Sequence, residues 1–423
     1  MKDTVFKQEL DNSLTLLYQK APYVASASLG VWVRVGSRFE KDSEMGYTHF
    51  LEHMLFKGTE NRTAKQLAEE VERVGGYFNA ATSREYTYYY VTVASANLEL
   101  GFRILSDMLF HSLLLQEDVE NEAEVILEEM RSYEDSPDDY VYDAYFRNIY
   151  AGQKLGRDII GTRESVGSVT ASKLKRFYNK HYRTDRMILA ISANLPEKKI
   201  TALAKKYFSV ETPPANPSHY KLRKVKKSFV VNFEKRDLNQ VSFLIGAEGY
   251  ARNFEAIVRK ILLTTILGGG MSSRLFQKIR EDQGLCYSIS CFPSSFSNTG
   301  VINISCATSN KRFLYCLDSI MQELKEVKNN GFSQKELDDA KSNQIGSMSI
   351  GFESPETRMM NIAMQELYYE QYRDFNQRVK AIQAVTLDDL YETITQVFSV
   401  GKLHFTGIGN LTDTAIQKID TSL

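Results

Sequence analysis

Two hydrophobic patterns alternate along the chain and predict a mixture of helices and strands. Within residues 118–133, apolar residues recur every three or four positions from Val119 to Met130, which is typical of a helix with one buried face. Residues 77–94 are instead rich in Tyr, Thr and Val, with a turn-like break at 83–85, and predict paired strands. Sheets of this kind need helices to cover their apolar faces.

The two halves of the sequence repeat the same order of predicted elements. Segment 91–109 reads as a strand that leads into a helix, and segment 304–324 has the same pattern. The strand at 28–35 likewise has a counterpart at 241–247, and the acidic helix of the first half has one at 333–350. We therefore predict an α+β protein of two homologous domains, each a mixed β-sheet covered by helices.

A proline-rich segment separates the two repeats. Residues 211–218 hold three of the eight prolines of the chain, between a helical end and a strand-rich basic segment. We predict one domain at 1–210, a linker at 211–224 and a second domain at 225–423. A chain of 423 residues is too long for one ordinary domain and agrees with this division.

A zinc-binding pattern lies in the first domain, where His49 and His53 flank a helical apolar segment with Glu52 between them. Residues four apart stand on one helix face, so both rings can bind one cation while Glu52 lies beside it. A Glu directly before the second His is the inverted form of the zinc-protease motif. In the second domain, the corresponding helix has no such pattern.

A catalytic zinc needs three protein ligands and one open position, so a further ligand is required. The predicted helix at 118–133 offers several carboxylates on its polar positions: Glu120, Glu122, Glu124, Glu128 and Glu129. Glu122 and Glu129 are two turns apart and share a face. Spacing alone does not choose among the five, and most of them read as a solvated helix face.

Three segments in the same order, 48–59, 75–87 and 122–129, make the chain resemble the pitrilysin (insulinase) family of zinc metallopeptidases, in its two-domain, processing-peptidase-like branch. The resemblance covers nearly the whole chain. It implies one zinc ion per chain, with Glu129 as the distal ligand and Glu122 as an accompanying acidic residue. It also implies that the two domains form half of a clamshell.

The resemblance assigns further residues to the substrate. Asn79 and Ala80 correspond to an element on an edge strand beside the metal, where an extended peptide can add to the sheet. Arg280 and Tyr287, in the second domain, correspond to a pair that reaches the substrate and helps to hold the developing oxyanion. A surface ion pair and a core tyrosine are the simpler interpretation of these two residues.

The expected activity is zinc-dependent hydrolysis of peptides or of short unfolded segments, with Glu52 as the general base that activates water. Two other classes remain open. One is a non-catalytic partner subunit, as some relatives of this family are. The other is a zinc hydrolase that acts on compounds other than peptides. The bland interpretation of His49 and His53 is a structural pair on a half-buried helix. The complete set of metal-binding residues favours the peptidase.

Composition narrows the partners and the compartment. A formal net charge of −1 gives no basic field, so neither nucleic acid nor an anionic membrane is expected as a partner. Four cysteines without paired spacing read as small core residues in a reducing compartment. The first residues, from Met1 to Asp11, lack the apolar core of a secretory signal, and we expect a cytoplasmic protein.

The length also bears on assembly. Members of this family that work as one long polypeptide resemble two such chains joined, so a chain of 423 residues implies a dimer. A homodimer is expected, with a heterodimer of this chain and a related one as the alternative. The metal of one subunit is then expected to face Arg280 and Tyr287 of the other.

Overall fold

The computed structural model describes residues 4–210, 229–249, 251–399 and 401–423. The chain forms two compact units that interleave in sequence: Met1–Arg131, Arg157–Lys221 and Met348–Phe375 in the first, and Ser132–Gly156, Leu222–Ser347 and Asn376–Leu423 in the second. The predicted linker, 211–224, lies outside the described residues. The predicted domain boundaries concern sequence repeats rather than these packing units. Those boundaries stay a prediction.

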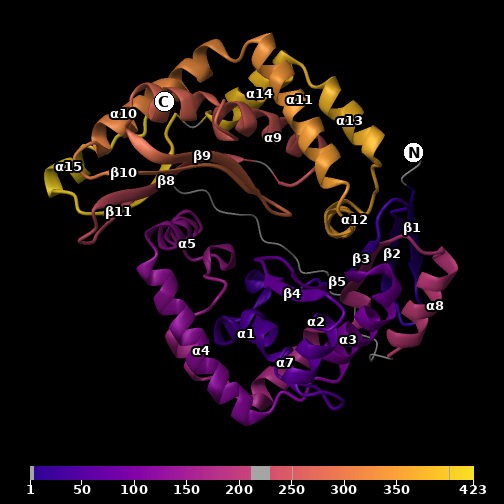
Figure 1. Ribbon diagram of the computed structural model, residues 1–423. Helices are drawn as coiled ribbons and strands as arrows, with labels where there is room; N and C mark the ends of the chain where they lie inside the picture. Colours follow the sequence, from indigo (N-terminus) through magenta and orange to yellow (C-terminus); the bar gives the residue numbers. More distant parts are fainter. Residues whose placement is uncertain (1–3, 211–228, 250, 400) are drawn as a thin grey trace. The chain divides into compact units, whose positions relative to one another are not determined.

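The first unit is built on a six-stranded mixed sheet with the strand order β1-β2-β6-β3-β5-β4 (Figure 1). The strands are β1 (Val5–Glu9), β2 (Thr15–Lys20), β3 (Ser26–Val33), β4 (Tyr77–Thr82), β5 (Thr87–Ala94) and β6 (Met187–Ala193). Only β2 and β6 run parallel; the other neighbours are antiparallel. β6 is buried at every position, as expected for a central strand with both faces covered.

Helices cover both faces of this sheet. The helices of the first unit are α1 (Tyr47–Met54), α2 (Ala64–Glu72), α3 (Leu98–Phe110), α4 (Gln116–Asp135, up to Arg131), α6 (Arg163–Gly167), α7 (Ala171–His181), α8 (Glu197–Tyr207) and α12 (Pro355–Tyr369). Residues of α1, α2, α3, α7 and α8 share one core with β3 and β5. On the opposite face, α12 packs on β2, β3 and β6 and buries Trp32.

The second unit contains a five-stranded mixed sheet with the order β7-β11-β8-β10-β9. Its strands are β7 (Val231–Lys235), β8 (Gln240–Gly249), β9 (Cys286–Ser295), β10 (Gly300–Ser309) and β11 (His404–Gly409). Its helices are α5 (Pro137–Ile149), α9 (Phe254–Gly268), α10 (Phe313–Asn330), α11 (Gln334–Gly351, up to Ser347), α13 (Phe375–Ala384), α14 (Leu387–Val397) and α15 (Asp413–Gln417). Phe146 of α5 packs in a core with Leu244 on one face, and Phe313 of α10 contacts Phe243 on the other.

The two sheets have the same topology. The order β7-β11-β8-β10-β9 repeats β2-β6-β3-β5-β4, including one parallel pair followed by antiparallel neighbours. The predicted fold class, two related mixed sheets each covered by helices, is therefore confirmed. The clamshell stays a prediction.

Each sheet is covered on one face by a helix from the other half of the sequence. α5 precedes the proline-rich segment and yet packs on β8 and β11, whereas α12 lies far beyond it and packs on the first sheet. Both helices begin in the same way, with a serine followed by proline: Ser136-Pro137 and Ser354-Pro355. Proline at the first helical position is favoured because its missing N–H has no partner there anyway.

Among the described helices, none combines the length and the apolar character that a bilayer span requires.

Candidate metal centre

Two helices of the first unit bring the predicted zinc residues together. α1 carries His49, Glu52 and His53 on one face, and α4 carries Glu122 and Glu129 two turns apart. α1 buries Phe50, Leu51 and Met54 in the core, which turns both imidazoles away from it. This follows from the helical period, because the apolar positions and the histidines occupy different faces.

The side chains of His49, His53 and Glu129 converge. One ligand atom from each lies within 4.8 Å of the other two. The Oε2 atom of Glu129 is 3.7 Å from Nε2 of His49 and 3.5 Å from Nε2 of His53. Among the residues that the structure describes, this is the one group of three or more His, Cys, Asp or Glu side chains close enough to share a metal ion.

Glu122 orients His53 instead of joining this group. Its Oε1 atom lies 2.8 Å from Nδ1 of His53, and its other oxygen forms an ion pair with Lys57. An imidazole that donates its Nδ1 proton to a carboxylate presents the lone pair of Nε2, the atom that faces Glu129. The Glu122 side chain is only 4% exposed and is paired with Lys57, three residues beyond the end of α1.

The electrostatics of the two histidines differ. Burial, together with the nearby His53, lowers the pKa of His49 to about 3, so this ring is neutral at ordinary pH. Burial also acts to lower the pKa of His53, but the hydrogen bond with Glu122 and the surrounding carboxylates outweigh it and raise the value. Burial raises the pKa of Glu129. The carboxylates around His53 thus favour positive charge at this position.

Glu52 lies beside the group without belonging to it. Its Oε2 atom accepts a hydrogen bond from the hydroxyl of Thr82 at the end of β4. Burial raises the pKa of Glu52, and the bond from Thr82 only partly offsets this. The Thr82 hydroxyl thereby fixes one carboxylate oxygen of Glu52, and the Glu52 side chain, next to His53 in the sequence, is held in a defined orientation.

β4 is the edge strand beside α1, as the resemblance implies. Successive side chains of a strand point to opposite faces of the sheet. Ala80 therefore shares the face of Thr82, the residue that binds Glu52, whereas Asn79 lies on the opposite face. The exposed Asn79 side chain accepts a hydrogen bond from the backbone N–H of Ala80. The two predicted substrate residues therefore belong to the same backbone edge but to different faces of the sheet.

Arg280 and Tyr287 lie side by side in the second unit. Arg280 belongs to a π-helical segment, Phe276–Asp282, a conformation that is frequent at functional sites. Its guanidinium carbon lies 4.5 Å from the ring centroid of Phe276 and 5.2 Å from that of Tyr287. Tyr287 is 78% exposed, so it is not the core tyrosine that the simpler interpretation required. Their role toward a substrate stays a prediction.

The three side chains fit a zinc ion. Two imidazole nitrogens and one carboxylate oxygen are a donor set that zinc takes in catalytic sites, with a fourth position left for water. Oε2 of Glu129 is buried and accepts no hydrogen bond from the described part of the chain, although it lies within 3.7 Å of two ring nitrogens. Such an atom is costly to leave without a partner, and a cation between the three atoms removes that cost.

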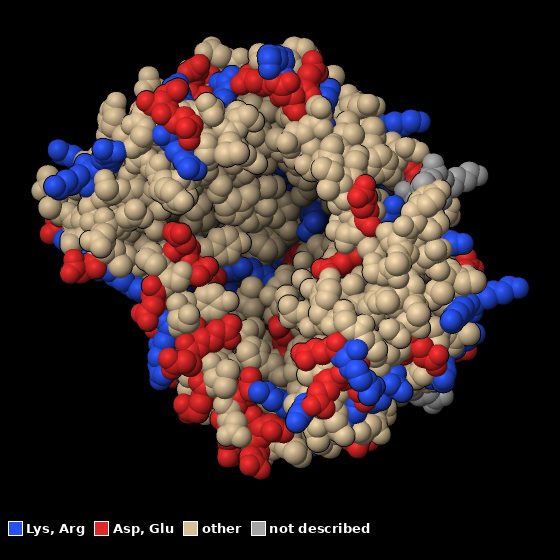
Figure 2. All heavy atoms as spheres, viewed as in Figure 1, with Lys and Arg blue, Asp and Glu red and all other residues tan. Residues whose placement is uncertain are grey.

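The other acidic residues of α4 face solvent. Figure 2 shows acidic side chains gathered over this helix, at the lower left of the view. Five of its glutamates are exposed: Glu117, Glu120, Glu124, Glu128 and Glu134. The helix therefore separates a solvated acidic face from the two carboxylates that turn inward, which is the distinction that spacing alone left open.

Sequence reasoning missed the partners that hold the site residues. Thr82 lies within the matched segment 75–87 and Lys57 within the matched segment 48–59, but neither residue is marked by its own pattern. Both contacts join segments far apart in the sequence, so no local pattern marks them. One sequence signal was available for Lys57: it follows His53 by four residues, a spacing that brings two side chains to the same side of a helix.

Comparisons with known proteins show the family and the fold of the chain. The model of the family described as "Insulinase (Peptidase family M16)" matches residues 15–163, and that of the "Peptidase M16 inactive domain" matches residues 168–344. The second name fits a repeat without the His-x-x-Glu-His pattern. The fold is similar to the crystal structure of a protease from Helicobacter pylori, with a TM-score of 0.90, 21% identity and coverage of 96% of this chain and 99% of that one.

Curated relatives match along most of their length. The chain is 32% identical to the uncharacterized zinc protease YmxG of Bacillus subtilis, over 92% of this chain and 94% of the relative. It is 33% identical to an uncharacterized zinc protease of Rickettsia felis, over 94% and 96% of the two chains. With both halves matched by family models and relatives above 30% identity, the chain belongs to the insulinase family of peptidases.

Proposed function

We propose that this protein is a zinc-dependent endopeptidase. The observation that carries the proposal is the convergence of His49, His53 and Glu129 within 4.8 Å, beside a carboxylate, Glu52, that is not needed as a ligand. Relatives named as zinc proteases support the choice of metal and reaction. One ion per chain is expected, because the second unit, as described, holds no comparable group.

A bound zinc ion polarises the scissile carbonyl and lowers the pKa of water toward neutrality. The residues of the chain supply the remaining steps. Glu52 takes the proton of the attacking water and passes it to the leaving amine, while Thr82 keeps its carboxylate in place. Glu122 holds His53 in the tautomer that frees its Nε2 atom.

The substrate class follows from the edge strand. Among the described strands, β4 is at the end of the sheet and pairs only with β5, and it carries Thr82, whose hydroxyl binds Glu52. An extended peptide can pair with such an edge through its main chain, which gives affinity with weak sequence preference. We therefore expect unstructured peptides or unfolded segments as substrates, in preference to folded proteins.

The test is peptide cleavage followed by mass spectrometry, with and without a chelator. Glu52→Gln keeps the shape of the side chain but cannot accept a proton, and should lower kcat by about 10²- to 10⁴-fold at unchanged zinc content. Glu124→Gln, on the exposed face of α4, is the matched control. Zinc binding without any cleavage by the unmodified chain would favour the alternative, a non-catalytic or partner-dependent subunit.

A dimer is part of the proposal, on the strength of chain length and family resemblance. Tyr287 is exposed beside Arg280 in the second unit, which suits a role toward a substrate. Mixing a Glu52→Gln chain with a Tyr287→Phe chain should then restore one working site for each mixed dimer. Activity no higher than the sum of the two separate variants would contradict a site shared between subunits.

We also propose a cytoplasmic location. The four cysteines are free, and Sγ of Cys306 lies only 3.8 Å from Sγ of Cys316. Neighbouring free thiols suit a reducing compartment. Fractionation of cells that express the full chain tests this location directly.

A further inference from the structure

The metal helix has no capping residue of its own. The residue at the N-cap of α1 is Gly46, whose φ of 82° is left-handed and which provides no side-chain hydrogen bond. A Cβ atom at this position would meet the carbonyl oxygen of Ile160 at 2.6 Å, so the packing excludes any larger residue. The first N–H groups of a helix have no partner within it, and here they must find one elsewhere.

Glu40 supplies that partner from outside the helix. Its carboxylate accepts hydrogen bonds from the backbone N–H of Gly46 at 2.9 Å and of Thr48 at 2.7 Å, and from the Thr48 hydroxyl at 2.7 Å. Glu40 and Thr48 are both fully buried. A carboxylate at this position also suits the positive end of the helix dipole.

These bonds fix the rotation of α1 next to its first metal-binding residue. Thr48 directly precedes His49 and is held at both its backbone and its side chain. Since His49 Nδ1 is buried and makes no hydrogen bond among the described residues, no contact at that atom orients the ring. The direction of Nε2 toward Glu129 therefore depends on the backbone that Glu40 holds.

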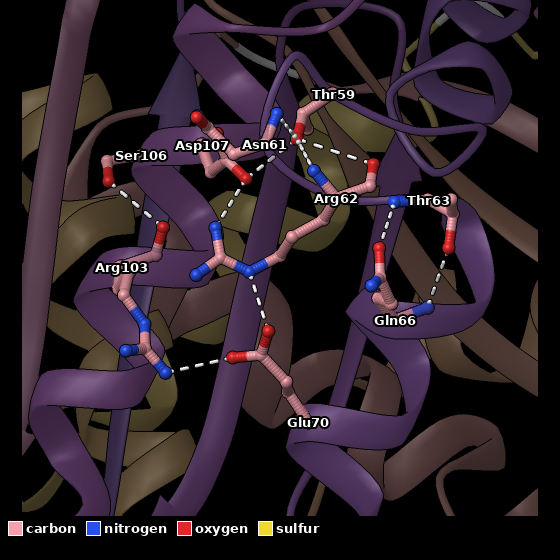
Figure 3. Close-up of polar contacts among 9 residues, drawn as sticks. All are labelled: Thr59, Asn61, Arg62, Thr63, Gln66, Glu70, Arg103, Ser106 and Asp107. Carbon is pink, nitrogen blue, oxygen red and sulfur yellow. Dashed lines mark hydrogen bonds and ion pairs between the residues drawn. The ribbon is translucent and has the colours of Figure 1, made fainter.

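The far side of α1 is anchored by a second buried carboxylate. Figure 3 shows Asp107 of α3, which accepts hydrogen bonds from Thr59 at 2.7 Å, Asn61 at 2.6 Å and Arg62 at 2.6 Å. Arg62 and Arg103 in turn bind Glu70 of α2. The segment after the metal helix is thus fixed, so loosening at Glu40 would let α1 pivot at its amino end.

We propose that Glu40 is a positioning residue of the metal centre: it caps α1 from outside and thereby directs His49 toward the ion. The inference rests on the proposed zinc site but needs no cleavage to be tested. It goes beyond stability, because a cap that served only folding would leave the metal affinity of the folded protein unchanged.

The experiment compares Glu40→Gln with Glu366→Gln in the full chain. Glu366 is also a buried carboxylate of the first unit, bound by Lys7 at 2.8 Å and by Tyr372, but it lies on α12 at the opposite face of the sheet. The readouts are zinc affinity by chelator competition, the visible spectrum of the cobalt-substituted protein, and thermal unfolding without metal.

Both variants should unfold at lower temperature, but only Glu40→Gln should bind zinc about tenfold more weakly and alter the cobalt spectrum. If Glu40→Gln does not fold, Thr48→Val removes the hydroxyl donor alone and should shift the same two readouts in the same direction. Metal affinity and spectra equal to those of Glu366→Gln would overturn the positioning role. Absence of zinc binding by the unmodified chain would instead refute the proposed function.

Discussion

The two units share a sheet topology but treat the corresponding helices differently. The helix after β3 is α1, which depends on Glu40 for its cap, whereas the helix after β8 is α9, which is capped by its own Asn253 through a 2.7 Å bond to the N–H of Ala256. α9 uses its faces for packing, with Leu262, Leu263 and Leu267 fully buried. α9, which supplies its own N-cap, packs in the core of its unit, whereas α1, which is capped by a residue outside the helix, presents polar side chains to the candidate metal site.

The acidic helices show the same contrast. When the two Ser-Pro starts that follow them are aligned, Ala340 and Ser347 of the second repeat stand where the first has Glu122 and Glu129. Ala340 is buried, as Glu122 is, so the second repeat fills that position with a methyl group instead of a carboxylate. The two repeats thus share a scaffold and differ in a few polar residues at the candidate metal centre.

The largest effect should come from removing the metal ligand that distinguishes α4 from α11. Glu129→Gln replaces a carboxylate with a weaker neutral ligand, and zinc affinity should fall by more than the roughly 10- to 100-fold typical of outer partners. Peptidase activity should be lost with it. The control is Glu128→Gln, whose side chain is 70% exposed on the same helix. Retained zinc in the Glu129 variant would contradict the assignment.

The exchange of helices between repeats can be tested through stability. Phe146→Ala on α5 removes a fully buried ring from the second unit and should cost about 3–5 kcal/mol. Met359→Ala on α12 makes the matching change in the first unit, at about 2–5 kcal/mol. Hydrogen exchange should increase at β8 and β11 for the first variant, and at β3 and β6 for the second. The reverse pattern would contradict the interleaved units.

A buried lysine gives the second unit a pH dependence. Burial, with Arg252 as a second cause, lowers the pKa of Lys260 on α9 to about 8, below its usual 10.5. The folded state then releases its proton before the unfolded state does, so this residue's contribution to stability rises with pH between those two values. Below pH 8 the charged amine costs about 3 kcal/mol. Lys260→Met should therefore stabilise the protein at pH 7 and much less at pH 10.5, measured by denaturant unfolding.

A smaller effect should separate Glu122 from Glu129. Glu122→Gln weakens the hydrogen bond to His53 and the ion pair with Lys57, and zinc affinity should fall by about 10- to 100-fold, without complete loss. The control is Glu120→Gln, on the solvent-exposed face of α4, which should leave the zinc affinity unchanged. A complete loss with Glu122→Gln would indicate that this residue binds the metal itself.

Much of this organisation could be predicted from the sequence. The repeat of strands and helices and the pairing of His49 with His53 follow from local periodicity, which helix and strand geometry impose. The choice of Glu129 over its neighbours did not follow from periodicity, because the predicted helix at 118–133 holds five glutamates; the family resemblance pointed to Glu129. Thr82 and Lys57 act through contacts between distant segments, and the packing of α5 and α12 on the sheets of the other repeat is likewise tertiary. Glu40 bonds to residues only six and eight positions away, but through an irregular segment that no periodic pattern marks.

The interleaving of the units has a consequence for the order of synthesis. Every residue that binds the proposed metal has been made by the time Arg131 is added. The face of the first sheet that carries Trp32 and Ile188 stays uncovered until α12, which ends at Tyr369, has been synthesised. Between the synthesis of β6 and that of α12, a nascent chain therefore holds a complete set of proposed metal ligands on a sheet with one face uncovered, and a truncated first half would remain in that state.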